Sequence, residues 1–331
     1  MIGCHPTILN VYRLARKYSS HSLPVLITGE TGTGKELLAR YLHVQSPFGR
    51  RPFVTVDCGI LSREMARSEL FGYVRGAFTG AYSTRSGLIE AASGGTLFLD
   101  EIGELDANLQ LHLLRLIQEG EFRPVGANQS KRVDFRLIAA TNRNLRKRVE
   151  RGEFREDLYF RLCVVHLHIP PLRERRTDIP ILIEHFLREI EIQPKRPFTP
   201  EAMSILQNYL WPGNVRELIN VVSSTQAISE GELVNQEDLP GYLQARQASP
   251  DFFDLPYKEA RQCCNRKFDR EYMHRALVNS GGNVTQAATK SGIGRQYFQV
   301  RMSEHGLKAS QYRSRKSPEY LNLQPNGIPP E

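Results

Sequence analysis

A glycine-rich segment with one lysine is the first part of the sequence whose residue types and spacing suggest chemistry. It follows an apolar stretch and opens a helical one, and it consists of Gly29, Glu30, Thr31, Gly32, Thr33, Gly34, Lys35 and Glu36. Glycines let successive backbone N–H groups turn toward phosphates, and the lysine adds a positive charge at the terminal phosphate groups. The pattern predicts a nucleotide-binding loop (P-loop), although a glycine-rich turn can have this spacing by accident. Glu36 is unusual, because most P-loops have a Ser or Thr there whose hydroxyl helps to hold Mg²⁺.

Two acidic residues at the end of an apolar run supply the second half of the expected site. Thr96–Leu99 has the composition of a buried strand, and Asp100 and Glu101 follow it directly. Such a strand places its last side chains at the carboxyl edge of a parallel sheet, where ligands bind. Asp100 is then the expected Mg²⁺ ligand, and Glu101 is placed to orient or deprotonate the water that attacks ATP. A strand that merely ends in solvent would leave the same pattern.

Short apolar strands and helical stretches alternate around these two segments. The expected strands are Pro24–Thr28, Phe53–Asp57, Leu97–Asp100 and Phe135–Thr141, and the expected helices between them are Glu36–Gln45 and Gln110–Gln118. Strands separated by helices predict an α/β fold whose parallel sheet is covered on both faces. After Pro170-Pro171 the strand pattern stops, and helical periodicity in Asp178–Glu191, Pro200–Leu210 and Asn214–Ile228 predicts a second, helical domain.

Composition limits the kinds of protein that the chain can be. Its 331 residues, of which 40% are hydrophobic, suffice for two or three globular domains. The longest apolar runs are far shorter than the roughly 20 residues that cross a bilayer, and no charged-then-apolar leader opens the chain. The five cysteines show no CxxC spacing. We therefore expect a soluble, cytoplasmic protein with reduced thiols and no membrane partner.

Positive charge is concentrated near the carboxyl end. The net charge is +8, and residues 255–316 alone carry +9, from 13 Lys and Arg against 4 Asp and Glu. Within them, Asn283–Ser291 and Arg295–Ser303 read as short helices on either side of Gly292-Ile293-Gly294, which predicts a helix-turn-helix. Its second helix carries side chains able to reach base edges and phosphates, namely Arg295, Gln296, Tyr297, Gln299 and Arg301. A solvated basic face on a plain helical hairpin is the alternative interpretation.

Seven stretches make the chain resemble a known family. They are Gly29–Glu36, Leu70–Gly72 with Gly76–Ala81, Gly94–Glu104, Ala140–Asn142, Phe154–Leu162, Pro171–Arg175 and Trp211–Leu218. They are similar to the successive motifs of bacterial enhancer-binding proteins, the AAA+ activators of sigma-54 RNA polymerase. The hexapeptide that is close to diagnostic for this branch of AAA+ proteins is Gly76, Ala77, Phe78, Thr79, Gly80 and Ala81. Glu also follows the P-loop lysine in that family, so Glu36 supports the resemblance.

The resemblance implies functional roles for several residues to which composition and spacing alone assign none. Thr141 and Asn142 match the first sensor of the γ-phosphate, and Arg216 matches the second sensor, which links a helical lid to the nucleotide. Arg155 and Arg161 match the arginines that reach into the site of a neighbouring subunit in a homo-oligomeric ring, a hexamer or a heptamer. Without the family, each arginine would be interpreted as a surface residue.

The hexapeptide also has a physical interpretation. Gly76 and Gly80 permit a tight, mobile backbone, and Phe78 offers one bulky apolar group among small neighbours. In the family this loop is similar to a piston tip that moves with nucleotide state and contacts the sigma factor. A phenylalanine that plugs its own core is the alternative.

Asp57 departs from the family pattern. The family usually has Asn at this position, and that side chain is thought to hydrogen-bond the catalytic glutamate until the partner engages. An ionised Asp57 has no proton to donate to an ionised Glu101, and two close carboxylates raise the pKa of one of them. We therefore expect the restraint on hydrolysis to be altered in this chain.

The patterns and the resemblance together predict five segments. They are an AAA+ α/β nucleotide-binding subdomain at residues 1–170, a helical lid at 171–240, a linker at 241–256, a Fis-like helix-turn-helix domain at 257–308 and a disordered tail at 309–331. Only 28 residues precede the P-loop. They are too few for the sensory domain that commonly precedes this ATPase, so control comes from another protein or the chain is part of a longer one.

The leading hypothesis is an ATP-hydrolysing, Mg²⁺-dependent activator. It would bind upstream activating DNA, assemble into a ring and remodel the closed complex of sigma-54 RNA polymerase holoenzyme into an open complex. Two other classes are a DNA-binding regulator whose ATPase fold is only a scaffold, and another AAA+ machine such as a helicase or clamp loader. The intact Lys35, Asp100 and Glu101 argue against the first, and the hexapeptide argues against the second. The sequence does not determine the target promoters, the regulatory signal or the number of subunits in the ring.

Overall fold

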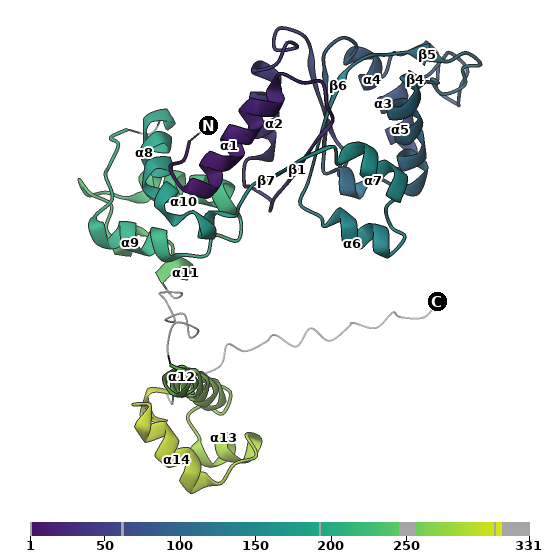
Figure 1. Cartoon of the computed structure of the whole chain (residues 1–331). Helices are drawn as coiled ribbons and strands as arrows, with labels where there is room; N and C mark the ends of the chain where they lie inside the picture. Colours follow the sequence, from purple (N-terminus) through teal and green to yellow (C-terminus); the bar gives the residue numbers. More distant parts are fainter. Residues whose placement is uncertain (1, 61–62, 192, 245–255, 308, 313–331) are drawn as a thin grey trace, which may run out of the picture. The chain divides into compact units, whose positions relative to one another are not determined.

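The computed structural model of the chain describes residues 2–60, 63–191, 193–244, 256–307 and 309–312. The chain divides into two compact units, Met1–Gln247 and Ala248–Glu331 (Figure 1). The first unit combines an α/β part with a helical part, and the described residues of the second unit are helical. Among all these residues, no helix has both the length and the apolar character that crossing a membrane requires.

A parallel sheet forms the centre of the α/β part. Its strands lie in the order β2-β3-β6-β1-β7, and they are β1 Val25–Thr28, β2 Phe53–Asp57, β3 Thr96–Asp100, β6 Arg136–Thr141 and β7 Val165–His168. Strands β1, β3 and β6 are almost entirely buried, as expected for strands that are covered on both faces. The parallel α/β arrangement that the sequence predicts is confirmed, and the carboxyl ends of the strands meet at one edge.

Helices cover both faces of this sheet (Figure 1). On one face, α1 (Pro6–Ser19) and α2 (Lys35–Val44) share a buried core with the strands, in which Ile8 and Leu38 join Ile27. The helices that share the core on the other face are α3 Arg63–Phe71, α4 Leu88–Ala91, α5 Ala107–Glu119, α6 Leu145–Glu150 and α7 Glu156–Leu162. A 3-10 turn and a short antiparallel pair complete this part, namely Ile102–Glu104, β4 Glu121–Phe122 and β5 Lys131–Arg132.

Arg136, at the start of β6, ties α1 and α2 to the sheet. Its side chain is buried, and its guanidinium donates hydrogen bonds to the carbonyl oxygens of Tyr18 (3.1 Å), Ser19 (3.0 Å) and Leu42 (2.9 Å). These carbonyls belong to the last turns of two helices, where oxygen atoms lack helical N–H partners and a positive charge is favourable. The buried cation therefore fixes the position of α2, whose first residue is Lys35.

The helical part of the first unit follows β7. It contains α8 Ile179–Glu189, α9 Pro200–Asn208, α10 Asn214–Ile228 and α11 Gly241–Gln244, with 3-10 turns at Leu172–Glu174, Arg176–Asp178 and Gln236–Asp238. Trp211 is fully buried in its core. The linker predicted from residue 241 starts later, since Leu243 is buried in the same core and the Gln244 amide donates to the Leu239 carbonyl (3.0 Å). One apolar residue among polar neighbours leaves no periodic signal, and most of the remaining predicted linker lies outside the described residues.

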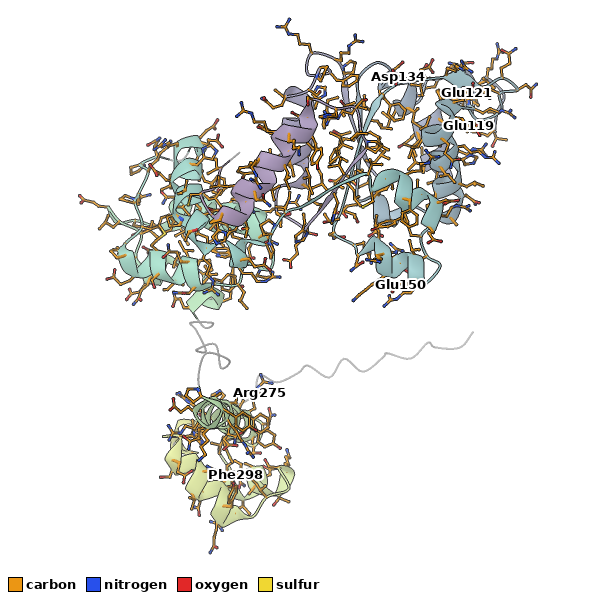
Figure 2. All side chains as sticks on the ribbon, viewed as in Figure 1. Glu119, Glu121, Asp134, Glu150, Arg275 and Phe298 are labelled. Carbon is orange, nitrogen blue, oxygen red and sulfur yellow. The ribbon has the colours of Figure 1, made fainter. Side chains whose placement is uncertain are left out.

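Three helices and a 3-10 turn make up the described part of the second unit. They are α12 Tyr257–Val278, α13 Val284–Lys290, α14 Arg295–Glu304 and the turn Ala309–Tyr312. Helices α13 and α14 occupy the two segments predicted as a helix-turn-helix, and Phe298 of α14 is buried between the helices (Figure 2). The tail predicted from residue 309 starts later, since the Tyr312 hydroxyl lies 2.8 Å from Nδ1 of His274 on α12. The rest of that predicted tail lies outside the described residues.

Candidate functional site

The predicted P-loop connects β1 to α2, so it lies at the carboxyl edge of the sheet. Lys35 begins α2, and its side chain is only 7% exposed. Its ammonium donates to the carbonyl oxygen of Gly29 (3.2 Å) and lies 3.2 Å from a carboxylate oxygen of Glu101. The loop is therefore already folded around its lysine, and the start of α2 offers backbone N–H groups to a phosphate.

Gly32 shows why this loop needs glycine. Its φ angle is +79°, and a Cβ atom built on it would lie 2.2 Å from the carbonyl oxygen of Gly213. Both the left-handed conformation and the close approach exclude a larger residue. Because Gly213 belongs to the helical part, that part and the P-loop touch backbone to backbone.

Asp100 and Glu101 lie at the end of β3, beside the P-loop. One oxygen of the Glu101 carboxylate faces Lys35, and the other accepts the backbone N–H of Asn142 (3.0 Å). The Asn142 side-chain amide donates in turn to the hydroxyl of Thr31 (2.9 Å). The fold thus brings together residues that the sequence predicted from three separate stretches of the chain.

The charges around Asp100 affect its ionisation. Burial raises the pKa of the Asp100 carboxyl, and the negative charges of Glu101 and Asp57 raise it further, whereas the Lys35 ammonium opposes them. Asp57 lies opposite Asp100 in the paired strands, and its own carboxylate accepts the N–H of Gly59 (2.9 Å). The residue that departs from the family pattern therefore acts on the ionisation of Asp100.

A cavity of about 460 Å³ opens beside Thr33 and Gly34 of the P-loop. Its walls come from α1, α2, α8 and α10, and they are largely apolar, with contributions from Ile8, Leu182 and Val215. Its size and apolar character suit a flat heterocyclic base, with the P-loop at one side for the phosphates. The cavity therefore lies where the P-loop, the α/β part and the helical part meet.

The two predicted sensors differ in exposure. Thr141 is buried, and its hydroxyl accepts the N–H of Arg143 (3.0 Å), so the side chain that faces the P-loop is that of Asn142. Arg216, on α10, is exposed, and its Cβ lies 3.1 Å from where a Cβ on Gly32 would be. Arg216 has no hydrogen bond or ion pair within the described ranges, so its guanidinium is available to a bound nucleotide.

Two predicted site residues are engaged elsewhere within the chain. Glu36 pairs with Arg40 (2.8 Å) on the exposed side of α2, so its carboxylate points along the helix surface. Arg155 pairs with Asp157 (2.7 Å) at the start of α7. Arg161, later in α7, is exposed and forms no ion pair in the described part of the chain. Of the two arginines predicted to act across a subunit boundary, Arg161 is thus the one without a competing partner.

The predicted contact loop Gly76–Ala81 lies between α3 and α4. Its ends are joined by a hydrogen bond from the Gly76 N–H to the Ala81 carbonyl (2.9 Å). Phe78 is 46% exposed, lies outside the buried core clusters and meets the edge of the Tyr73 ring with centroids 5.0 Å apart. A phenylalanine that plugs a core would be buried, so the geometry favours an outward role for this side chain.

The predicted DNA-contacting residues lie on α14. Those with exposed side chains are Arg295, Gln296, Tyr297 and Gln299. Arg301 is instead held within the unit, because it pairs with Glu304 (3.1 Å) and stacks over the Tyr297 ring at 5.4 Å. Arg301 would have to leave these partners to reach a base or a phosphate.

The fold and the site define a class of protein, a P-loop ATPase of the AAA+ type with a helical lid and a helix-turn-helix unit. Known families divide the chain in the same way. Residues 1–168 match the Sigma-54 interaction domain, residues 173–252 match an AAA+ ATPase lid domain, and residues 266–305 match the Bacterial regulatory protein, Fis family. The chain belongs to the family of sigma-54-dependent transcriptional regulators, and its first unit is an ATPase.

Individual relatives agree with this assignment. The chain is 43% identical over 312 residues to the transcriptional regulatory protein GlrR of Escherichia coli K12, covering 93% of this chain and 68% of GlrR. It is 42% identical over 314 residues to the nitrogen fixation protein AnfA of Azotobacter vinelandii, covering 93% of this chain and 57% of AnfA. Among solved structures, NtrX of Brucella abortus in complex with ATP superposes with a TM-score of 0.69 at 32% identity, covering 93% of this chain and 69% of NtrX.

Some residues of the site were missed by the sequence analysis. The side chains of α1 that line the base-sized cavity received no role, although Pro6 directly after His5 is a helix-start signal that could have located that helix. Arg173 and Asn214, which both contact Glu30 of the P-loop, were quoted only as parts of motifs. No spacing in the sequence reveals a contact between residues so far apart along the chain.

Proposed function

We propose that this chain is an ATP-driven activator that remodels the closed complex of sigma-54 RNA polymerase into an open complex. The main support is the coexistence of two features, a P-loop site built around Lys35 and Glu101 and a loop that leaves Phe78 outside the protein core. The first has the groups that hydrolysis requires, and the second holds no part of the nucleotide site and is available to a partner. GlrR is named a transcriptional regulatory protein, which agrees with a role in transcription.

The residues present fit ATP with Mg²⁺. One Asp100 oxygen accepts the backbone N–H of Glu101 (3.0 Å), which leaves the other for a metal ion. The described residues contain no group of three or more His, Cys, Asp or Glu side chains that could hold a metal ion alone. A Mg²⁺ ion shared between one or two carboxylates and the phosphates needs no such group. When bound, it would neutralise charge on the phosphates.

Lys35 and Glu101 provide the hydrolytic step. The Lys35 ammonium and the Glu101 carboxylate lie 3.2 Å apart, so each charge is partly neutralised by the other. A phosphate bound at Lys35 gives the ammonium a second anionic partner, so the Glu101 carboxylate is released to accept a proton from the attacking water. The Asn142 N–H holds the other oxygen of Glu101 and keeps the carboxylate oriented.

Assembly into a ring completes the site in this proposal. Arg161, and Arg155 once it leaves Asp157, would reach the nucleotide of the neighbouring subunit and stabilise charge on the transferred phosphoryl group. Hydrolysis per subunit should therefore rise with protein concentration. A mixture of Arg161→Ala chains with Asp100→Ala chains should regain part of the activity that each lacks, whereas turnover independent of concentration would mean that each subunit is complete alone.

The second unit would bring the activator to its upstream DNA. Residues 255–316, which carry a charge of +9, include α12, α13 and α14, and the exposed face of α14 carries Arg295, Gln296 and Gln299. Removing residues 255–331 should abolish specific DNA binding and leave ATP hydrolysis. Retained DNA affinity in the shortened chain would move the DNA-binding surface to the first unit.

Open-complex formation at a sigma-54 promoter, measured with purified polymerase, tests the whole proposal. We expect strand opening that requires both this protein and hydrolysable ATP. A protein that binds the DNA and hydrolyses ATP without opening the promoter would instead be a regulator or an AAA+ machine of another kind.

A further inference from the structure

The turn before α10, in the helical part, forms hydrogen bonds with the P-loop. The Asn214 side-chain amide donates to a carboxylate oxygen of Glu30 (3.1 Å) and to the backbone carbonyl of Thr31 (3.1 Å). The next residue, Val215, donates its backbone N–H to the carbonyl of Gly32 (3.0 Å). Three successive residues of the phosphate-binding loop are therefore held by one turn.

A second contact between the helical part and the P-loop comes from the first residues of the helical part. Arg173, in the first 3-10 turn after β7, donates to both carboxylate oxygens of Glu30 at 2.8 and 2.5 Å. Its guanidinium holds the pKa of the Glu30 carboxyl below its usual range, with a further hydrogen bond from Asn214. The side-chain oxygen of Asn214 also accepts the backbone N–H of Leu172 (2.8 Å), so the ring from Arg173 through Glu30 to Asn214 is closed by the backbone between Leu172 and Arg173.

The turn that makes these contacts is held in an uncommon backbone conformation. Trp211 has a φ angle of +49° and Asn214 one of +53°, although neither is glycine. The left-handed region costs a residue other than glycine free energy, and Asn tolerates it better than most. Trp211 is buried and donates its indole N–H to the Leu206 carbonyl (2.7 Å), which anchors the turn in the core of the helical part.

We propose that Glu30, Arg173 and Asn214 form a latch through which the orientation of the helical part sets the geometry of the phosphate-binding loop. This inference rests on the proposed ATP site. Arg216 follows Asn214 by two residues, and its Cβ lies 3.1 Å from where a Cβ on Gly32 would be, so the latch also sets the position from which its side chain would reach a bound phosphate. Arg173 and Asn214 are positioning residues in this account, since they act on ATP through the loop that they hold.

The test measures ATP hydrolysis by the full chain in a double-mutant cycle. Glu30→Gln and Arg173→Ala each break the bidentate pair, and each should lower kcat/KM for ATP roughly 10-fold, because a charge-assisted pair orients the loop. Since both changes open one latch, the double variant should be no worse than the poorer single one. Arg173→Lys, which keeps the charge and loses the bidentate geometry, should fall in between. Asn214→Gly keeps the left-handed backbone accessible and should resemble Arg173→Ala.

Two controls separate a latch from a general loss of structure. Arg188→Ala removes another arginine of the helical part, one that pairs with Glu184 on the surface of α8, and it should behave like the parent. The unliganded Glu30→Gln and Arg173→Ala variants should unfold close to the parent temperature, because both side chains are partly exposed, while the stabilisation that ATP gives should shrink. Asn214→Gly should unfold at a lower temperature, because Asn214 is buried and accepts the backbone N–H of Leu172. Losses that multiply in the double variant, or an Arg173→Ala protein equal to Arg188→Ala, would overturn the latch.

The Lys35→Ala variant separates this inference from the proposal on which it rests. An inactive Lys35→Ala protein beside latch variants with parental kinetics would overturn the latch alone. Parental turnover in Lys35→Ala would overturn the ATP site and the latch together.

Discussion

The P-loop site and the loop Gly76–Ala81 are both rich in glycine, but they differ in how far contacts with the rest of the chain hold their side chains in place. Lys35 and Glu101 are paired with each other, and Glu30 is held by Arg173 and Asn214. Loop Gly76–Ala81 is closed mainly by hydrogen bonds within itself, and its phenylalanine lies half exposed against one tyrosine. The side chains of the first region are held by other parts of the chain, whereas the second region leaves its phenylalanine half exposed, as the proposed contact with a partner requires.

The glycines of the two regions show the same difference. Gly32 and Gly76 both have positive φ angles. A Cβ atom on Gly32 would collide with the Gly213 carbonyl, whereas one on Gly76 or Gly80 would meet no atom within 4 Å. Gly32 is required by crowding as well as by backbone conformation. Gly76 and Gly80 are required by backbone conformation alone, since no atom lies close enough to exclude a Cβ.

The largest effect should come from breaking the organised region at its reacting group. Glu101→Gln removes the carboxylate that accepts the proton from water, so turnover should fall at least ~100-fold while ATP binding is retained. Steady-state hydrolysis and nucleotide titration measure the two quantities. Glu104→Gln, which loses only a surface pair with Arg143, is the matched control and should hydrolyse ATP like the parent. Undiminished turnover in Glu101→Gln would remove Glu101 from the role.

A smaller effect is expected on stability, because the partly buried negative charge of Asp100 serves hydrolysis at a cost in folding free energy. The folded-state pKa of Asp100 is raised above its unfolded value, so the ionised carboxylate opposes folding at neutral pH. Asp100→Asn should therefore raise the unfolding temperature of the unliganded protein by about a few degrees at pH 7, although hydrolysis is lost. The gain should shrink as the pH falls through the raised pKa of Asp100, and it should vanish well below about 3.9, the unfolded pKa, where the carboxyl is protonated in both states. An unfolding temperature lowered at pH 7 would contradict this account.

The smallest effect should come from Asp57. Its negative charge contributes to the raised pKa of Asp100, so Asp57→Asn should lower that pKa. The acid limb of the pH profile of kcat/KM should then move slightly to lower pH, since the Asp57 charge is the weakest of the contributions to the raised pKa. Asp134→Asn, at the opposite, amino edge of the sheet before β6, is the control (Figure 2). A shift to higher pH, or an equal shift in both variants, would exclude Asp57 from this role.

Much of the organised region could be predicted from the sequence because its signals are local. The strand β2 and the helix α10 were predicted at the bounds that the structure has, since apolar runs and helical periodicity are read within one segment. Lys35, Asp100 and Glu101 were identified by the elements that they follow. Helix α1 and strand β7 were missed, the latter because exposed His residues alternate with Val165 and Leu167 and interrupt the apolar run.

What escaped prediction depends on contacts between distant segments. Glu30 and Arg173 are 143 residues apart, and neither residue type nor spacing links them. The ion pairs of Glu36 with Arg40 and of Arg155 with Asp157 were not predicted either, because the motifs that contain Glu36 and Arg155 do not specify these partners. The exposure of Phe78 is equally a tertiary property, since the sequence allowed both a plug and a contact.

The measurement that tests the central comparison most directly is the Phe78→Ala variant, assayed at once for thermal unfolding, ATP hydrolysis and open-complex formation. Phe71→Ala is its matched control, because Phe71 is buried in the core and its truncation should cost about 3–5 kcal/mol of stability. We predict that Phe78→Ala melts with the parent and hydrolyses ATP within a few-fold of it, but fails to open the promoter. A Phe78→Ala protein that behaves like Phe71→Ala, or one that is stable and still opens the promoter, would contradict the account.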